Sequence, residues 1–336
     1  MLRRSILLGL SLFVVGPLQA AEVNLYSARQ ENLIKPLLDQ FTEKTGVKVN
    51  LVAGKADALL QRLQTEGRNS PADVLLTVDA GRLHRAVAAE LTQTVDSELL
   101  NDVIPSQYRD PDGHWFGLSL RARPIMYAKD RVKPSELSTY EDLADAKWKG
   151  RVCIRSSGNI YNQSLVASML AADGLGSVQS WADGFVKNFA RPPAGGDRDQ
   201  LKAAAAGQCD VAVANTYYLV TMHQSSDEAQ REAANQMAVF WPNQDGRGAH
   251  VNVSGAAMLK SSKNTDEAVQ LIEFLASEDA QRWYADKNGE YPVRAGVPMS
   301  DLLASWGEFK ADDVNMRELG RFNAEAVRLM DRAGWR

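Results

Sequence analysis

The fold is decided by residues 23–78, which read VNLYSARQENLIKPLLDQFTEKTGVKVNLVAGKADALLQRLQTEGRNSPADVLLTV. Short apolar runs rich in Val and Leu predict strands, and apolar residues at helical spacing predict helices between them. The expected elements are strand 23–28, helix 33–41 ended by Gly46, strand 47–51, helix 56–63 and strand 72–78, then a short helix at 82–90. This alternating order predicts an α/β fold with a parallel sheet and helices on both faces.

A second set of alternating elements follows. We expect strands at 123–128, 151–155, 209–215 and 250–259, and helices at 159–172, 180–190, 199–207, 265–276, 278–287 and 315–332. The order of elements indicates that the chain leaves one α/β lobe, forms a second lobe and then returns to the first. This organisation is typical of a hinged protein with a cleft between the lobes. Ligands of open α/β sheets bind beyond the carboxyl ends of the strands. The loops that follow 151–155 and 209–215 are therefore expected to face the cleft.

The first twenty residues, MLRRSILLGLSLFVVGPLQA, have the pattern of a secretory signal peptide. Arg3 and Arg4 precede a short apolar stretch, and Ala20 offers a small residue for cleavage. The alternative is an N-terminal anchor, but a membrane-spanning helix needs about 20 apolar residues. We expect the mature chain to be exported and soluble.

Size and charge limit the class of protein. The 336 residues suit two domains. The formal net charge is −4 at pH 7, and loss of Arg3 and Arg4 would make it more negative. Nucleic-acid binding usually needs a basic face, so we expect no nucleic-acid partner.

The chain has two cysteines, Cys153 and Cys209. In an oxidising compartment we expect a disulfide bond between them, although two free buried thiols remain the alternative. Each cysteine precedes a tyrosine by eight residues, Tyr161 and Tyr217. A bond would hold together the two strand ends that lead to these tyrosines.

Adjacent tyrosines, Tyr217 and Tyr218, follow the apolar strand 209–215. Such a pair usually serves packing, because consecutive residues in a regular helix point about 100° apart. At a junction between a strand and a helix, however, both phenols can turn toward one point. Their position at the carboxyl end of a strand therefore makes them candidate ligands.

Three phenolates suit a hard trivalent cation. A tyrosine with a pKa near 10 ionises near neutral pH only beside a strong positive charge, and a bound metal ion supplies one. Oxygen donors from Tyr161, Tyr217 and Tyr218 favour Fe(III) over zinc or copper(I). The remaining coordination positions would suit an anion such as carbonate, held by Arg121 and by the helix start at Ser156, Ser157 and Gly158.

The sequence lacks the usual motifs of catalysis. It contains no GxSxG, HExxH or CxxC motif, and its four histidines are scattered. We therefore expect a binding protein and not an enzyme.

Seven segments resemble the periplasmic ferric-binding proteins, which are the solute-binding components of bacterial iron ABC transporters. They are YSAR (26–29), GKADALLQRL (54–63), WFGLSLRAR (115–123), SSGNIYNQS (156–164), GGDRDQLK (195–202), NTYY (215–218) and HVNVSGAA (250–257). The resemblance implies a two-lobed, type II periplasmic-binding-protein fold, with each lobe a mixed, mainly parallel sheet flanked by helices and a ligand cleft between the lobes. We assign residues 21–121 and 247–300 to lobe 1, and residues 122–246 and 301–336 to lobe 2.

The resemblance also implies a ligand set. Tyr217 and Tyr218 match the family's paired ligands, Tyr161 matches a third tyrosine used by one branch, and Arg121 matches the arginine that holds a synergistic anion, carbonate or bicarbonate. Some members carry a His, or His followed by Tyr, where this chain has Gln30 and Glu31. The chain therefore resembles the branch with three tyrosines and an anion.

Further ligands from lobe 1 are left open, with Gln30, Glu31, Asp57 and Tyr26 as candidates that we do not expect to bind. The expected function is capture of a ferric ion or ferric chelate in the periplasm by a monomer, followed by delivery to an inner-membrane ABC permease. Two alternatives remain: a binding protein for a phosphonate or carboxylate, and an exported enzyme.

Overall fold

The computed structural model describes residues 21–336, so the predicted signal peptide at residues 1–20 lies outside the described residues. The strands are β1 (Glu22–Ser27), β2 (Lys48–Ala53), β3 (Val74–Val78), β4 (Phe116–Ala122), β5 (Ile125–Ala128), β6 (Val152–Cys153), β7 (Val211–Val213), β8 (Met237–Phe240), β9 (Val251–Met258) and β10 (Tyr291–Pro292). The helices are α1 (Glu31–Thr45), α2 (Ala56–Glu66), α3 (Ala80–Ala88), α4 (Glu98–Val103), α5 (Ile160–Val186), α6 (Asp197–Ala205), α7 (Thr216–His223), α8 (Glu228–Gln236), α9 (Thr265–Leu275), α10 (Glu278–Trp283), α11 (Asp301–Ala304), α12 (Arg317–Arg321) and α13 (Asn323–Arg332). A π-helix, η6 (Tyr284–Asn288), follows α10.

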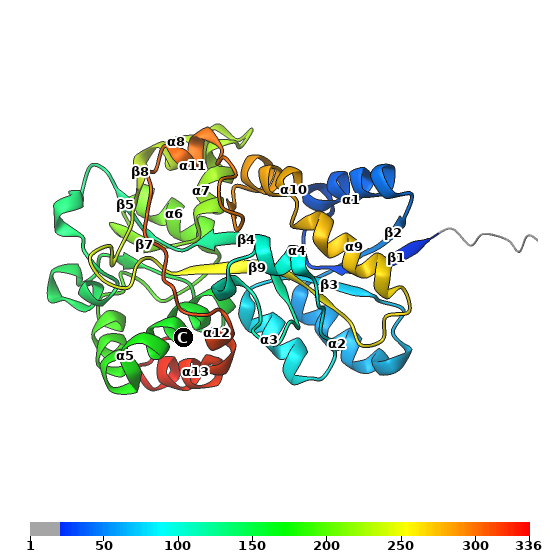
Figure 1. Cartoon of the computed structure of the whole chain (residues 1–336). Coiled ribbons are helices and arrows are strands. Elements are labelled where there is room, and N and C mark those ends of the chain that lie inside the picture. The colour runs from blue at the N-terminus through cyan, green and yellow to red at the C-terminus, as the bar shows by residue number, and fades with distance from the viewer. Residues whose placement is uncertain (1–20) are drawn as a thin grey trace, which may run out of the picture.

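The strands form two sheets, each flanked by helices (Figure 1). One sheet has the order β10-β4-β9-β3-β1-β2, and the other has the order β6-β7-β5-β8. The predicted α/β fold with two sheets is confirmed. The expectation that the sheets are mainly parallel is wrong for the described strands, because only β1–β2, β1–β3 and β6–β7 pair in parallel. The long strand β9 pairs antiparallel with both β3 and β4, where the chain returns to the first sheet after β8 of the second.

The structure of α1 explains why the apolar spacing of the sequence predicts this helix. Ile34, Leu37, Leu38 and Phe41 are the buried residues of α1, so the apolar stripe faces the core. The helix ends at Gly46, whose φ of 75° lies in the left-handed region that glycine adopts without a Cβ clash. The predicted end of this helix is therefore confirmed.

Two predicted helices lie on either side of a break in one span, and two further predicted elements differ from the observed ones. The helices predicted at 159–172 and 180–190 both fall within the span of α5, which a break at Gly174, where φ is 76°, divides into two helical parts as predicted. The helix predicted at 315–332 is split into α12 and α13. The strand predicted at 151–155 is shortened to Val152–Cys153, because the chain turns toward α5 directly afterwards.

Each sheet has its own hydrophobic core. Val23, Leu76 and Val253 belong to the core around the first sheet. Val152, Val211 and Trp335 belong to the core around the second. The lobe boundaries given above stay a proposal, and Leu303 and Met316 of the C-terminal segment pack in the core of the first sheet.

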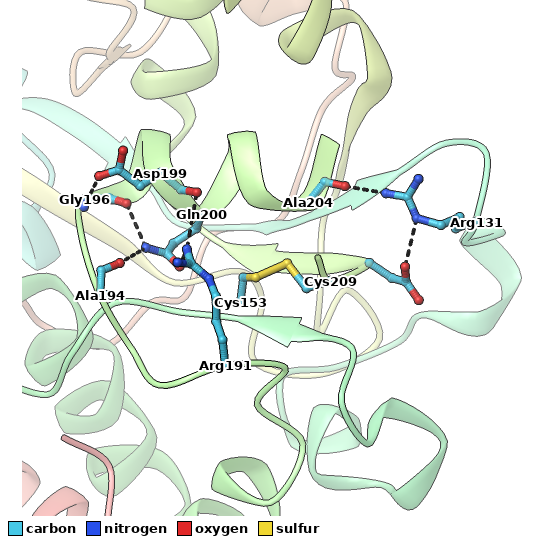
Figure 2. The surroundings of a disulfide bond; sticks show 10 residues. Arg131, Cys153, Arg191, Ala194, Gly196, Asp199, Gln200, Ala204 and Cys209 are labelled. Atoms are coloured by element: carbon cyan, nitrogen blue, oxygen red, sulfur yellow. Dashed lines mark hydrogen bonds and ion pairs between the residues drawn. A yellow bond between two sulfur atoms is a disulfide. The ribbon is translucent and has the colours of Figure 1, made fainter. Parts of the chain in front are cut away.

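The disulfide bond predicted from the cysteine count is present between Cys153 and Cys209, with Cα atoms 5.9 Å apart (Figure 2). Both cysteines are buried. Cys153 ends β6, and Cys209 lies just before β7, the parallel neighbour of β6. The bond therefore ties the two strands whose carboxyl ends lead to α5 and α7.

A buried carboxylate connects the first sheet to α5. Asp79, at the start of α3, accepts hydrogen bonds from Ser164 Oγ at 2.7 Å and from Asn252 Nδ2 at 2.9 Å. Burial raises the pKa of the Asp79 carboxyl, since its charged form is desolvated. Because Ser164 lies one turn after Tyr161, this contact fixes the start of α5 relative to β3.

In the part of the chain from residue 21 onward, no helix is both long and apolar enough to cross a bilayer.

Candidate metal centre

A cavity of 210 Å³ lies where segments from both sheets meet. Its lining residues are Ala28, Arg29, Gln30, Leu33, Val78, Arg121, Tyr161, Arg198, Tyr217, Tyr218, Thr221, Lys287, Asn288 and Glu290. The three predicted tyrosines and Arg121 therefore share one cavity. Larger cavities exist, including one of 720 Å³ beside α2 and α3, but none of the three tyrosines lines that cavity.

The strand order brings the tyrosines together. Tyr161 is the second residue of α5, which follows β6, and Tyr217 and Tyr218 lie in the first turn of α7, which follows β7. Since β6 and β7 are parallel neighbours, their carboxyl ends share one edge of the sheet. The ring centroids of Tyr217 and Tyr218 are 4.3 Å apart. The backbone at the start of α7 thus turns both adjacent phenols into the same cavity.

Arg121 lies against the phenols and is only 5% exposed. Its Nη2 donates to the Tyr161 hydroxyl at 3.4 Å. Its guanidinium carbon is 4.9 Å from the centroid of the Tyr161 ring and 4.4 Å from that of Tyr217. A fixed cation at this point favours the ionised form of each neighbouring phenol.

The phenols differ in their pKa values. Burial acts to raise the pKa of Tyr161, but the charge of Arg121 and hydrogen bonds with Tyr217 and Arg121 outweigh it, so the pKa is lowered. Burial raises the pKa of Tyr217 well above its ordinary value and also raises that of Tyr218. Burial acts to lower the pKa of the Arg121 guanidinium, but the charges of Tyr161, Tyr217 and Glu290 outweigh burial. The pKa of Arg121 is therefore raised well above its ordinary value, and the guanidinium stays charged.

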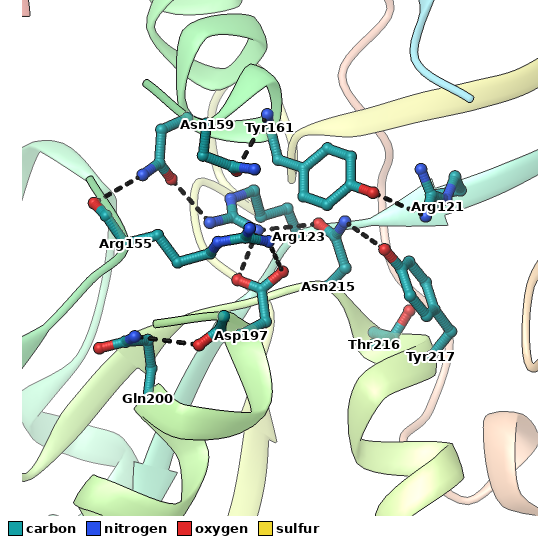
Figure 3. Close-up of polar contacts among 12 residues, drawn as sticks. Arg121, Arg123, Arg155, Asn159, Tyr161, Asp197, Gln200, Asn215, Thr216 and Tyr217 are labelled. Atoms are coloured by element: carbon teal, nitrogen blue, oxygen red, sulfur yellow. Dashed lines mark hydrogen bonds and ion pairs between the residues drawn. The ribbon is translucent and has the colours of Figure 1, made fainter. Parts of the chain in front are cut away.

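A buried polar network reaches the Tyr217 hydroxyl through Asn215 (Figure 3). Asn215 Nδ2 donates to the Tyr217 hydroxyl at 3.2 Å, and Asn215 Oδ1 accepts from Arg123 Nη1 at 3.0 Å. Arg123 also pairs with Asp197 at 3.2 Å, and their side chains are 1% and 0% exposed. Because Arg123 occupies the amide oxygen, the Asn215 amino group is left to face Tyr217.

Glu290 also lines the cavity, and it was not among the residues predicted from the sequence. Its carboxylate is buried and pairs with Arg29 Nη2 at 2.7 Å, accepts from Ser119, and lies 3.5 Å from Arg121 Nε. Burial acts to raise its pKa, but Arg29 and Arg121 outweigh this, so the pKa of Glu290 is lowered. This carboxylate links the loop after β1 to Arg121.

The segment Ser156, Ser157 and Gly158 is not among the residues that line the cavity. The Ser156 carbonyl accepts from Asn162 Nδ2 at 3.1 Å, and the Ser157 carbonyl accepts from Gln163 Nε2 at 3.0 Å. These bonds hold the start of α5. Its predicted role in anion binding stays a prediction.

The four open candidates from the first lobe lie in different places. Gln30 lines the cavity, whereas Glu31 is in the first turn of α1 and does not. Tyr26 is buried, and its hydroxyl donates to Glu66 at 3.1 Å. Asp57 pairs with Arg82 at 2.9 Å outside the cavity. Of these four residues, Gln30 alone lines the cavity that the phenols share.

The site residues that were not predicted are marked by no local motif in the sequence. Arg29, Asp197 and Asn215 lie inside segments quoted above for the resemblance, but nothing in those segments assigns them a role. Glu290 and Asn288 lie in the plain run KNGEYP and reach the cavity only through tertiary packing. In the described residues, no group of three or more His, Cys, Asp or Glu side chains is placed to hold a metal ion.

Replacing Arg121 with Gln is expected to raise the pKa of the Tyr161 phenol, because the nearest positive charge is removed. The expectation from the sequence that Tyr161 binds Fe(III) then implies that iron affinity falls about 10- to 100-fold, as is usual when a partner of a metal ligand is lost. Ultraviolet titration of the iron-free protein measures the first effect, and competition with a chelator measures the second. Arg68→Gln, an exposed arginine outside this cavity, is the matched control. An unchanged Tyr161 titration would contradict the role given to Arg121.

Residues 37–311 match the family of bacterial extracellular solute-binding proteins. The chain belongs to this family. This solute-binding protein is 54% identical over 320 residues to iron uptake protein A1 of Synechocystis sp., a match that covers 95% of this chain and 89% of that protein.

Solved structures agree with this assignment. A Trichodesmium protein in complex with iron and citrate superposes with a TM-score of 0.92 and 51% identity, over 94% of this chain and all of the other. The ferric binding protein of Campylobacter jejuni gives a TM-score of 0.88 and 41% identity, over 94% of this chain and all of the other. The resemblance to ferric-binding proteins inferred from the sequence is confirmed.

Proposed function

We propose that this solute-binding protein captures Fe(III) in the periplasm for uptake through an inner-membrane ABC permease. Tyr161, Tyr217 and Tyr218 supply three phenolate oxygens, and Arg121 holds a synergistic anion beside them. The observation that carries the proposal is the meeting of these four side chains on one cavity. The names of the iron-binding relatives support it.

The charges on the ligands select the cargo. Three phenolates neutralise a trivalent cation, and hard oxygen donors favour ferric iron over softer metals. Reduction to Fe(II) removes one positive charge against the same three phenolates, so the reduced ion is held less tightly. Carbonate is the anion that we propose to fill open coordination positions at Arg121, with the Ser156–Gly158 segment as its further partner.

Delivery requires the cavity to open and close. We propose that the cargo first binds to the phenols of the second lobe, and that the first lobe then closes over it by hinge motion. The monomer in its closed form would be the species that the permease recognises.

Two alternative functions lead to different expected results in experiments. A binder of an organic anion would use Arg121 as a carboxylate partner and would leave the phenols protonated. An exported enzyme would turn over a substrate in the absence of metal. Addition of ferric ion and bicarbonate distinguishes them, because phenolate-to-iron charge transfer should turn only the iron-binding protein orange or red. A protein that stays colourless would refute the iron proposal.

Acidification is expected to release the iron. Each phenol must lose its proton to bind, and burial raises the pKa values of Tyr217 and Tyr218, so these protons are present at neutral pH without metal. Affinity should therefore fall by about tenfold per displaced proton for each pH unit lost. A chelator competition between pH 8 and pH 5.5 measures the slope. A pH-independent affinity would show that protonated phenols are not displaced.

A further inference from the structure

A buried carboxylate, that of Asp79, lies directly behind the wall of the cavity. Val78, the last residue of β3, lines the cavity, and Asp79 follows it without lining the cavity itself. Asp79 is fully buried. Its backbone has a φ of 80°, in the left-handed region that residues other than glycine rarely adopt. Strained residues of this kind concentrate at functional sites, so Asp79 calls for an explanation beyond the capping of α3.

Asp79 connects three elements of the fold. Its Oδ1 accepts hydrogen bonds from Ser164 Oγ of α5 at 2.7 Å and from the backbone N–H of Gly81 of α3 at 2.9 Å. Its Oδ2 accepts from Asn252 Nδ2 of β9 at 2.9 Å. All three partners are donors, so the ionised carboxylate satisfies each of them. Because α3 follows β3 of the first sheet and α5 follows β6 of the second, the bond between Asp79 and Ser164 joins the two lobes.

The first turns of α3 and α5 pack closely at this bond. A Cβ placed on Gly81 would lie 3.4 Å from Cδ1 of Ile160 and 3.7 Å from Oγ of Ser164. Ile160 is buried, begins α5 and directly precedes Tyr161. Residues three apart lie on the same side of a helix, so Tyr161 and Ser164 share one side of α5. The bond from Ser164 therefore holds the helical turn that carries the Tyr161 phenol.

A second route leads from Asp79 to the same phenol. Asn252 Oδ1 accepts from two backbone N–H groups, each at 2.8 Å, so its Nδ2 is left to donate to Asp79. Asn252 on β9 is the register partner of Arg121 on β4. Arg121 Nη2 donates to the Tyr161 hydroxyl at 3.4 Å (Figure 3). Asp79 is thus connected to Tyr161 through α5 on one side and through β9 and β4 on the other.

We propose that Asp79 is a positioning residue for iron retention, because its hydrogen bond with Ser164 holds Tyr161 at the metal while the lobes are closed. This inference rests on the proposed iron function and adds to it a residue that does not touch the ion. Loss of the bond frees the first turn of α5, so Tyr161 leaves the ion more often and iron is released sooner. Tyr217, on α7, keeps its own hydrogen bond from Asn215.

The test compares two buried serines of α5. Ser164→Ala removes the donor to Asp79, whereas Ser168→Ala, one turn later, removes a hydroxyl that donates to the Leu165 carbonyl of the same helix. Each purified protein is loaded with ferric ion and bicarbonate and mixed with excess chelator, and the decay of the charge-transfer absorbance gives the rate of iron release. Ser164→Ala should release iron at least about tenfold faster, since a hydrogen bond to an ionised group is worth roughly that factor, and Ser168→Ala should release it at the wild-type rate.

A spectroscopic measurement separates positioning of Tyr161 from a general loss of packing. Absorbance per bound iron should fall in Ser164→Ala, because one of the three phenolates is less well placed, and should stay unchanged in Ser168→Ala. Asp79→Asn is a second variant. Its amide oxygen can still accept from Ser164, but its amino group meets the amino group of Asn252, so it should also release iron faster. If Asp79→Asn does not fold, as judged by circular dichroism, Ser164→Ala decides the result.

The possible outcomes distinguish this inference from the proposed function. Faster release with unchanged absorbance per bound iron would show that Tyr161 stays in place, and would overturn the positioning role. Equal effects in Ser164→Ala and Ser168→Ala would assign them to the packing of α5, and would also overturn it. Full colour and an unchanged release rate in Ser164→Ala would overturn this inference and leave the iron function intact. An absence of colour in the wild type would refute the iron function, and this inference with it.

Discussion

Tyr217→Phe combined with Tyr218→Phe is expected to abolish iron binding and its colour. The substitution removes two of the three oxygen donors that we propose and leaves the rings in place, where their centroids lie 4.3 Å apart. Affinity should fall by more than the roughly 10- to 100-fold that follows the loss of an outer partner of a metal ligand. Absorbance titration with ferric ion and bicarbonate, followed by metal analysis of the desalted protein, measures the loss.

The fold should survive this change, because both rings stay in place and the hydrogen bond lost is the one from Asn215 to the Tyr217 hydroxyl. Tyr140→Phe is a useful control, since Tyr140 is buried and its hydroxyl donates to the carbonyl of Arg123 outside the cavity. The control should keep its iron and lose some stability. Retention of a full equivalent of coloured iron by the double variant would eliminate these phenols as ligands.

Loss of the disulfide bond is expected to produce the largest change in stability. Cys153→Ser with Cys209→Ser opens a cross-link of 56 residues in sequence separation. The free energy of unfolding should fall by about 4 kcal/mol on the chain-entropy model, within the usual 2–5 kcal/mol for native disulfides. Urea denaturation of the iron-free, oxidised proteins measures the difference.

A reductant provides the matched control for this prediction. It should shift the unfolding midpoint of the wild type toward that of the double variant and leave the double variant unchanged. Since the bond ties β6 to β7, iron affinity should fall in parallel as Tyr161 and Tyr217 become less well placed. A wild type that unfolds at the same urea concentration with and without reductant would contradict the expected contribution.

Periodicity in the sequence predicted most elements of the fold. Apolar residues at helical spacing located α1, and Gly46 marked its end, because both features depend on local backbone geometry. The direction of the strands was harder to predict. Whether β9 pairs antiparallel with β3 depends on where the chain re-enters the first sheet, and this is a matter of long-range topology. The two parts of α5 were predicted as separate helices, and they meet at Gly174, whose positive φ breaks the helix.

The candidate site was predicted in part. Tyr161, Tyr217, Tyr218 and Arg121 were found because they lie next to predicted strand ends or in recognisable segments, and the structure brings all four to one cavity. Ser156, Ser157 and Gly158 were predicted from the same reasoning but do not line that cavity. A position at the start of a helix gives the direction of its N–H groups and does not give their distance from a ligand.

The sequence by itself determined the alternation of strands and helices, the single cysteine pair, and the phenols as the chemistry of the site. These properties depend on residue type and on spacing along the chain. Only the tertiary structure decided which charges surround the phenols. Glu290 and Asn288 are more than 70 residues from Tyr217 in the chain, and they line the same cavity because the turn at Gly289 packs against Val220 of α7. Contacts of that kind depend on how whole elements pack, and no local pattern of residues records them.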